Sequence, residues 1–271
     1  MNNQKSPQHT KLQIICVAAL LFCSTTVMAL ELVSPTVLIT GSNRGIGFEL
    51  ARQYAERGWG VIATCRTPAK ATALQQLAAD NSGVVIETLD VTDFAQIDAL
   101  AEKYRGAPID VLINNAGILG GNERQKFGSF DYAAFDEVMA VNTRGPIRMV
   151  EAFIDHVALS EQKKIMNISS AVGSITLTFS GQNFYRASKA ALNMSMRTIS
   201  KTLKRSDKPG HKEVIIGLIN PGVVDTDFAK NVPIPMIQAD ESAAAVISVI
   251  DAYTLKQTGS FMSYNGKPLP W

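Results

Sequence analysis

The sequence predicts an α/β fold in which a doubly wound, mostly parallel seven-stranded sheet carries helices on both faces. From Pro35 onward, short β-rich apolar runs alternate with longer stretches of helical period, which is typical of strand–helix–strand units. No linker rich in proline, glycine or serine divides this part of the chain. Residues 35–271 are therefore predicted to form a single domain.

The predicted strands are short apolar runs, and the predicted helices are the longer periodic stretches between them. Strands are expected at Thr36–Thr40, Gly60–Cys65, Val84–Leu89, Val111–Asn114, Lys164–Ile168, Val214–Leu218 and Ser260–Ser263. Helices are expected at Ile46–Arg57, Ala69–Ala79, Phe94–Tyr104, Tyr132–Ile154, Tyr185–Leu203 and Glu241–Tyr253. An irregular segment from Val223 to Gln238 precedes the last helix and is long enough to form a substrate lid.

Composition limits the classes of function that fit. With 271 residues, 46% of them hydrophobic, the chain can bury the core of one compact domain. The net charge is +2 and the Lys and Arg residues are scattered, so the sequence lacks the basic patch of a nucleic-acid binder. Of the three cysteines only Cys65 lies in the predicted domain, which excludes a disulfide within it.

Residues 1–29 have the layout of a secretory signal peptide. Lys5 and Lys11 precede an apolar run from Ile14 to Cys23, and Val27 and Ala29 offer small side chains before a cleavage point. The run has ten residues, whereas a bilayer-spanning helix takes roughly 20. We therefore expect export to the periplasm or the medium, with membrane contact only through this segment if it stays uncleaved. The alternative is an uncleaved tail or a misassigned start on a cytoplasmic protein.

A glycine-rich turn follows the first predicted strand and opens the first helix. It reads Thr40-Gly41-Ser42-Asn43-Arg44-Gly45-Ile46-Gly47. Its glycines let the backbone turn tightly and approach a pyrophosphate, and the helix N-terminus adds free N–H groups and a positive dipole end. In this strand–turn–helix context the turn predicts dinucleotide binding; the alternative is a loop with incidental glycines.

The end of the second strand indicates which dinucleotide fits. An acid at this point would accept hydrogen bonds from a free ribose 2′-hydroxyl and repel a 2′-phosphate. Here the position holds Arg66, and Arg44 lies in the glycine-rich turn. Two guanidinium groups stabilise a phosphate by charge-assisted hydrogen bonds, which favours NADP(H) over NAD(H). The alternative is a pair of solvated surface arginines.

The next two strand ends carry further cofactor candidates. Asp90, after the third strand, either accepts a hydrogen bond from an adenine amino group or caps the helix that begins near Phe94. After the fourth strand, Asn115, Ala116 and Gly117 let the backbone lie against a cofactor ribose. Asn115 has an equally good structural interpretation, in which it ties neighbouring strands together.

Tyr185 and Lys189 lie four residues apart, so they share one face of the predicted helix. That face continues inward as Leu192, Met196, Ile199 and Leu203. The pKa of a phenol is normally about 10, and a nearby ammonium favours the ionised form of the phenol. A hydride that reaches a carbonyl carbon leaves an alkoxide, which Tyr185 can protonate. The alternative is an ordinary surface tyrosine and lysine.

Other polar residues follow the later strands and helices. Ser170 can hold a substrate oxygen beside the phenol, and Asn142 can hold a water that links Lys189 to solvent, although Ser and Asn at element ends are usually caps. After Pro221-Gly222, Thr226 can bind a nicotinamide carboxamide. Apolar side chains that either line a substrate pocket or pack in the core are Ile118, Leu119, Phe179, Phe184, Val223 and Phe228.

Four motifs occur together in this order. They are TGxxxGxG at Thr40 to Gly47, NNAG at Asn114 to Gly117, YxxxK at Tyr185 to Lys189, and PG at Pro221-Gly222. With them the chain, from about Pro35 to Trp271, resembles the short-chain dehydrogenase/reductase family, whose members have a Rossmann fold. The ending from Ser263 to Trp271 and the short segment after Thr226 resemble the C-factor and sniffer-type carbonyl reductase branch.

The resemblance implies an NADP(H)-dependent oxidoreductase that moves a hydride between nicotinamide and a carbonyl or alcohol. It implies the catalytic residues Asn142, Ser170, Tyr185 and Lys189. The residues it implies for cofactor binding are Gly41, Ser42, Asn43, Arg44, Gly45, Ile46, Gly47, Arg66, Asp90, Val91, Asn115, Ala116, Gly117, Tyr185, Lys189, Pro221, Gly222, Val224 and Thr226. No metal ion is expected.

Three points stay open within the resemblance. Ser170 lies fifteen residues before Tyr185, slightly farther than the commonest gap in the family, which leaves Ser169 as an alternative. A cofactor-binding signalling or sensor protein of the C-factor type, with little turnover, is the alternative function. Family relatives often pair through long helices, so a homodimer is one expected assembly, and the partner of the site is a small molecule.

Overall fold

The computed structural model describes residues 1–2, 35–226 and 235–271. The described part of the domain contains a seven-stranded sheet in the order β3-β2-β1-β4-β5-β6-β7. Its strands are β1 Thr36–Thr40, β2 Gly60–Cys65, β3 Val84–Thr88, β4 Val111–Asn114, β5 Lys164–Ile168, β6 Ile215–Asn220 and β7 Ser260–Ser263. Every neighbouring pair is parallel, so the predicted doubly wound sheet is confirmed. Apart from Met1 and Asn2, the predicted signal-like segment lies outside the described residues.

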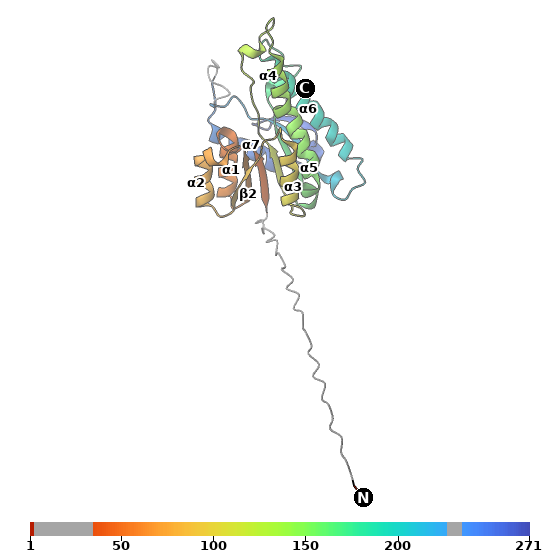
Figure 1. Ribbon diagram of the computed structural model, residues 1–271. Helices are drawn as coiled ribbons and strands as arrows, with labels where there is room; N and C mark the ends of the chain where they lie inside the picture. The colour runs from red at the N-terminus through yellow and green to blue at the C-terminus, as the bar shows by residue number, and fades with distance from the viewer. Residues whose placement is uncertain (3–34, 227–234) are drawn as a thin grey trace. The chain divides into compact units, whose positions relative to one another are not determined.

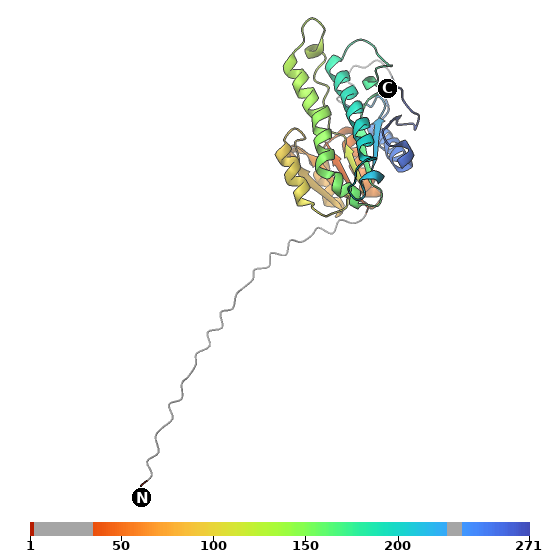
Figure 2. The same ribbon diagram turned by 90° about the vertical axis from the view of Figure 1, so that its right-hand side faces the viewer.

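Helices cover both faces of the sheet. They are α1 Gly45–Glu56, α2 Thr72–Asp80, α3 Phe94–Lys103, α4 Tyr132–Met139, α5 Gly145–Leu159, α6 Asn183–Leu203 and α7 Ala239–Ala252. Figure 1 shows α1, α2 and α7 on one side of the sheet and α3, α5 and α6 on the other. In the turned view of Figure 2, α4 and α6 run side by side. None of the helices described has the length and apolar character needed to cross a membrane.

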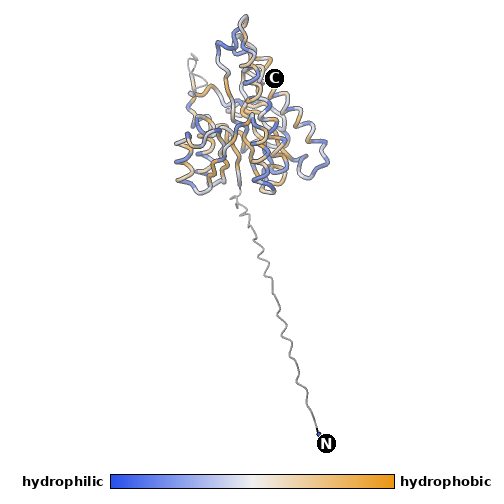
Figure 3. Tube along the Cα trace, in the orientation of Figure 1, coloured by the Kyte–Doolittle hydropathy of each residue, from blue (hydrophilic) through white to orange (hydrophobic). Residues whose placement is uncertain are grey.

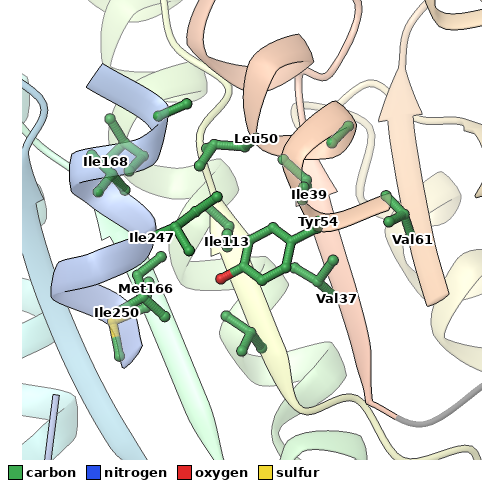
Figure 4. Packing of buried hydrophobic residues seen from close by; sticks show 14 of the residues in the cluster. Val37, Ile39, Leu50, Tyr54, Val61, Ile113, Met166, Ile168, Ile247 and Ile250 are labelled. Carbon is green, nitrogen blue, oxygen red and sulfur yellow. The ribbon is translucent and has the colours of Figure 1, made fainter. Parts of the chain in front are cut away.

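Successive side chains of each strand point to opposite faces of the sheet, so each face has its own apolar core. In β1, Val37 and Ile39 join the core under α1 and α7, whereas Leu38 joins the core under α5 and α6. Figure 4 shows the first of these cores, with the Tyr54 ring of α1 packed beside Val37 and facing α7. Figure 3 shows the same distribution for the whole domain, with hydrophobic residues inside and hydrophilic residues on the outer helix surfaces.

The predicted helix Tyr132–Ile154 is interrupted. A π-helical turn, Ala140–Arg144, separates α4 from α5 and carries Asn142. Pro146, in the first turn of α5, lacks the N–H that would bond to the carbonyl of Asn142 in a regular α-helix. The periodic pattern predicted one helix because the apolar spacing continues through the interruption, whereas the proline changes the backbone hydrogen bonds.

Parallel pairing brings the carboxyl ends of the strands to one edge of the sheet. Thr40, Asn114 and Ile168 end neighbouring strands, and the loops that follow them therefore meet. The chain order reverses between β1 and β4, which is the switch point where ligands bind in open α/β sheets. The fold places the glycine-rich turn and the polar strand ends on this edge.

Candidate active site

A cavity of about 1250 Å³ lies along the carboxyl ends of the strands. This volume exceeds the roughly 300–1,000 Å³ of a typical ligand pocket, so it has room for a dinucleotide and a second molecule together. Of the predicted site residues, all line the cavity except Ser42 and Asn142. Residues separated by most of the domain's sequence, from Gly41 to Thr226, thus share one site.

Ser42 was predicted to bind the cofactor, but the structure turns it away from the cavity. Its side chain is fully buried and donates to the carbonyl of Ile39 at 2.9 Å. Its backbone N–H donates to the carbonyl of Thr64 at 2.9 Å. Because the hydroxyl satisfies a buried carbonyl in β1, the Ser42 side chain holds the shape of the turn and does not reach the cavity.

The rest of the glycine-rich turn forms an open cradle. Gly41 and Gly45 have φ values of +71° and +56°, in the left-handed region that favours glycine. A Cβ on Gly47 would lie 2.3 Å from the carbonyl oxygen of Gly41, so the helix can approach the turn only without a side chain there. Arg44 is the N-cap residue of α1, and the first N–H groups of a helix have no partner within the helix, so they can bind an anionic ligand.

Three cationic side chains surround the end of β2. Arg44 and Arg66 line the cavity, as predicted, and they are joined by Lys70. Lys70 ends a short 3₁₀ turn, Pro68–Lys70, that follows β2 directly. Lys70 is not among the residues predicted from the sequence, although its position four residues after Arg66 was the available signal. All three side chains are exposed, which suits the binding of a charged phosphate group.

The structure excludes one of the two interpretations of Asp90 and supports the structural interpretation of Asn115. Asp93, not Asp90, caps α3 by accepting from the N–H of Gln96, so the capping role proposed for Asp90 is wrong. Asp90 lines the cavity and accepts from the Thr92 N–H at 2.9 Å. Asn115 donates from its side chain to the carbonyl of Thr40 at 2.9 Å and to that of Gly41 at 3.1 Å, which ties the end of β4 to the end of β1.

At the other end of the cavity, α6 presents Tyr185 and Lys189 toward the end of β5. Lys189 is buried and donates to the carbonyl of Ile168 at 2.9 Å. The side chains of Ser170 and Tyr185 are hydrogen-bonded to each other. Ser169 is buried and donates to the side-chain oxygen of Asn193 at 2.6 Å, inside α6. The structure therefore places Ser170, and not Ser169, beside the phenol.

Burial is the main cause of the pKa shifts of Tyr185 and Lys189. It raises the pKa of Tyr185 from 10.0 to about 12, although the hydrogen bond with Ser170 acts in the opposite direction. It lowers the pKa of Lys189 from 10.5 to about 8. The net shift of the phenol in the protein alone is therefore toward a higher pKa, opposite to the direction expected from the Lys189 charge. At neutral pH Tyr185 holds its proton and Lys189 its charge.

Asn142 does not face the cavity. It is fully buried in the π-helical turn, where its side-chain oxygen accepts from the N–H of Ile118 at 2.9 Å. Its side-chain N–H groups donate to the Ile118 carbonyl at 2.8 Å and to the Ser188 hydroxyl at 3.0 Å. The amide thus joins α6 to the loop after β4. The predicted contact with a water beside Lys189 is not tested by this arrangement, and the observed bonds give Asn142 a structural role.

The segment after β6 closes over the glycine-rich turn. The methyl group of Thr226 would lie 3.4 Å from a Cβ on Gly45, so Thr226 sits above the turn. Pro221, Gly222 and Val224 line the cavity with it. Residues 227–234 of the predicted lid lie outside the described residues, as does Phe228.

The remaining part of the cavity is lined by both apolar and polar residues. Ile118, Leu119, Phe179 and Val223 line it, which is one of the two alternatives left open by the sequence. Phe184 does not line it, because it packs against Ala134 and Val138 of α4. Gln125 and Phe127, from the loop before α4, also line the cavity and were not predicted from the sequence. Their signal was weak, because no motif or strand end marks that loop.

The C-terminal residue braces the loop that follows Ser170. The carbonyl of Trp271 accepts from the N–H of Thr176 at 2.9 Å and from its hydroxyl at 2.6 Å. The guanidinium of Arg197, on α6, lies 4.3 Å from the centre of the indole ring. The final residues thus hold one wall of the cavity against α6.

Comparisons with known proteins agree with this geometry. The family model for short chain dehydrogenases matches residues 35–235. The chain is 33% identical over 242 residues to 1-hydroxy-2-glutathionyl-2-methyl-3-butene dehydrogenase from Rhodococcus sp. (strain AD45), covering 87% of this chain and 99% of that protein.

Two solved structures extend the similarity to the fold. The NADPH-bound carbonyl reductase from chicken fatty liver is 32% identical with a TM-score of 0.79, covering 87% of this chain and 98% of that one. The carbonyl reductase Sniffer of D. melanogaster is 27% identical with a TM-score of 0.77, covering 87% of this chain and 99% of that one. The resemblance to the sniffer-type branch is thereby confirmed.

Proposed function

The chain belongs to the short-chain dehydrogenase family, and from that premise we propose that it is an NADP(H)-dependent carbonyl reductase with Tyr185 as its proton donor. The observation that carries the proposal is the meeting of Ser170, Tyr185 and Lys189 at one end of a cavity whose other end holds a glycine-rich turn and three cations. The relative from chicken binds NADPH and is itself a carbonyl reductase.

The residues at the cofactor end fit NADP(H). The cradle at Gly41, Gly45 and Gly47 excludes side chains and opens onto the N-terminus of α1, which suits a pyrophosphate. Arg44 and Arg66 would hold the 2′-phosphate, in a place where NAD-binding sites of this fold have an acid. When bound, the nicotinamide supplies the hydride for reduction or accepts it for oxidation.

The residues at the chemical end supply the proton and hold the substrate. Ser170 and Tyr185, already joined by a hydrogen bond, offer two hydroxyl groups to one carbonyl oxygen. Tyr185 keeps its proton at neutral pH, and transfers it to the alkoxide oxygen that forms when the carbonyl carbon is reduced. Lys189 carries its positive charge beside the ring, with its nitrogen 5.8 Å from the ring centre, and stabilises the phenolate left by that transfer.

The test is NADPH oxidation by the purified protein with a panel of aldehydes, ketones and quinones. Tyr185→Phe should lower kcat by about 10²–10⁴-fold, because it removes only the transferable proton. NADPH affinity should stay within about twofold of wild type, since the ring remains. Tyr132→Phe, an exposed tyrosine on α4, is the matched control and should keep full activity.

Two results would contradict the proposal. One is the absence of turnover across the whole panel although NADPH binds, which would favour a cofactor-binding sensor or signalling protein. The other is an equal loss of activity and NADPH affinity in Tyr185→Phe, which would remove the proton-donor role from Tyr185.

We also propose that residues 1–29 direct export of the protein. The signal-like segment lies before residue 35, where the family match begins. N-terminal sequencing of the protein from fractionated cells tests this. A mature N-terminus near residue 30 in an exported fraction is expected, and a full-length N-terminus in the cytoplasm would contradict export. NADPH is a cytosolic cofactor, which makes this measurement informative for the function as well.

A further inference from the structure

The helix that carries Tyr185 begins without a cap from its own sequence. Gln182, the N-cap residue of α6, has φ 51° and ψ 40°, and its side chain makes no capping bond. The first N–H groups of a helix have no partner inside the helix, and a side-chain oxygen of the N-cap residue usually accepts one of them. In α6 this acceptor has to come from elsewhere in the fold.

It comes from Gln125, sixty residues earlier in the chain. The side-chain oxygen of Gln125 accepts from the backbone N–H of Tyr185 at 2.9 Å. Asn183, in the same first turn, donates from its side chain to the backbone carbonyl of Gln125 at 3.0 Å. Both bonds join the loop before α4 to the turn of α6 that carries the phenol.

The other end of the Gln125 amide is fixed as well. Its side-chain N–H groups donate to the carbonyl of Leu119 at 2.7 Å and to that of Gly121 at 3.0 Å. Gln125 is 1% exposed, so water does not compete for these bonds. Between the two carbonyls, a Cβ on Gly120 would lie 2.4 Å from the Val138 side chain, so the loop is closely packed against α4.

One buried amide therefore connects the wall of the substrate cavity to the residue that carries the phenol. Leu119 lines the cavity one residue after Ile118, whose N–H and carbonyl are both bound by Asn142. The loop after β4 is thus held by two amides, and the one from Gln125 reaches Tyr185 itself.

We propose that Gln125 is a positioning residue that sets the backbone of Tyr185 relative to the substrate wall and so aims its hydroxyl. This inference rests on the proposed function for its catalytic consequence. A displacement of about 1 Å of a reacting group can cost around 10²-fold in rate, so a clamp on this backbone acts mainly on kcat. Cofactor binding depends on the opposite end of the cavity and should not change.

Two variants distinguish the hydrogen bonds that the Gln125 side chain makes with Tyr185 from those that it makes with Leu119 and Gly121. Gln125→Met keeps the length of the side chain and removes every hydrogen bond that it makes. Gln125→Glu keeps an acceptor for the Tyr185 N–H and replaces the donors to Leu119 and Gly121. Thr258→Val is the matched control, because the buried hydroxyl of Thr258 accepts from the N–H of Ile216 at 2.9 Å near the start of β6, far from the strand ends that border the cavity.

Gln125→Met should lower kcat by about 10- to 100-fold with NADPH affinity within about twofold of wild type. Gln125→Glu should retain more of kcat than Gln125→Met, since the bond to Tyr185 survives. Thr258→Val should lose melting temperature to a similar extent as Gln125→Met and keep kcat. A kcat of Gln125→Met within twofold of wild type would overturn the proposal. A kcat of Gln125→Glu that is no higher than that of Gln125→Met would overturn it as well.

Amide hydrogen exchange gives a readout that does not need turnover. The Tyr185 N–H should exchange at least about tenfold faster in Gln125→Met, relative to wild type and Thr258→Val, because its acceptor is gone. Unchanged protection would overturn the clamp. If wild type binds NADPH but reduces no carbonyl, the proposed function fails, and the exchange measurement still decides whether Gln125 holds Tyr185.

Discussion

Lys189 donates a hydrogen bond of 2.9 Å to the backbone carbonyl of Ile168, the last residue of β5. The side chain one helical turn after Tyr185 is therefore tied to the strand end that leads into Ser169 and Ser170. This bond brings the helix and the strand together at the point where Ser170 meets the phenol. The chemical end of the cavity is thus fixed by a lysine that also supplies its positive charge.

Substitution of Ser170 should lower the catalytic rate, whereas substitution of the neighbouring Ser169 should lower the stability. Ser170→Ala should lower kcat by roughly 10²-fold, because it removes the hydroxyl that we propose holds the substrate oxygen. Ser169→Ala should keep kcat within a few-fold and lower the free energy of unfolding by about 1 kcal/mol, since it breaks the buried bond to Asn193. Steady-state kinetics and denaturant unfolding of both variants check this. The reverse pattern would assign the substrate contact to Ser169.

Lys189 should make the stability of the domain depend on pH. Burial lowers its pKa from 10.5 to about 8, so between these values the unfolded chain holds a proton that the folded chain has released. The free energy of unfolding therefore rises with pH across this window, by up to about 3 kcal/mol. Tyr185, with its pKa raised to about 12, acts in the opposite sense, lowering stability as pH rises above about 10.

Unfolding measurements between pH 8 and pH 10 isolate the lysine. The slope of unfolding free energy against pH should be smaller in Lys189→Met than in wild type, because the variant lacks this proton release. Equal slopes in the two proteins would show that Lys189 does not titrate in this window.

Arg66 should decide the cofactor preference. Arg66→Asp should weaken NADPH binding by about 10- to 100-fold, the loss of a charged hydrogen bond, and should improve NADH binding. Lys201→Asp is the control, since Lys201 is exposed on α6 and outside the cavity, and the substitution changes the net charge equally. Titration of both cofactors against the three proteins measures the effect. An unchanged preference in Arg66→Asp would leave Arg44 and Lys70 to hold the phosphate.

Gly47 should tolerate no side chain. In Gly47→Ala the new methyl group would meet the Gly41 carbonyl at 2.3 Å and the Asn115 side-chain nitrogen at 2.4 Å. The variant should lose about 1–3 kcal/mol of stability through overpacking and bind NADPH more weakly, because α1 must move away from the turn. In the control Gly83→Ala the nearest atom, the Trp59 carbonyl oxygen, lies 3.3 Å away. Similar losses in the two variants would refute a specific packing role for Gly47.

Local pattern determined the seven strands, the helix that carries Tyr185 and Lys189, and the glycine-rich turn. These features depend on residues close in sequence: apolar runs set the strands, and the four-residue spacing sets a helix face. The stripe below that face is observed, since Leu192, Met196 and Leu203 are buried. The parallel topology then placed the strand ends, and hence most of the predicted site, along one edge.

Only the tertiary structure decided which polar groups turn toward the cavity. Ser42 lies within the glycine-rich motif and Asn142 was predicted as a catalytic residue, yet the side chain of each binds buried backbone groups and points away from the cavity, whereas Gln125 lies in no motif and accepts from the N–H of Tyr185. A hydrogen-bond partner in another element cannot be read from local periodicity. The pKa of Tyr185 is a second case, because the hydration lost by the phenol depends on everything packed around it, and that loss raises its pKa.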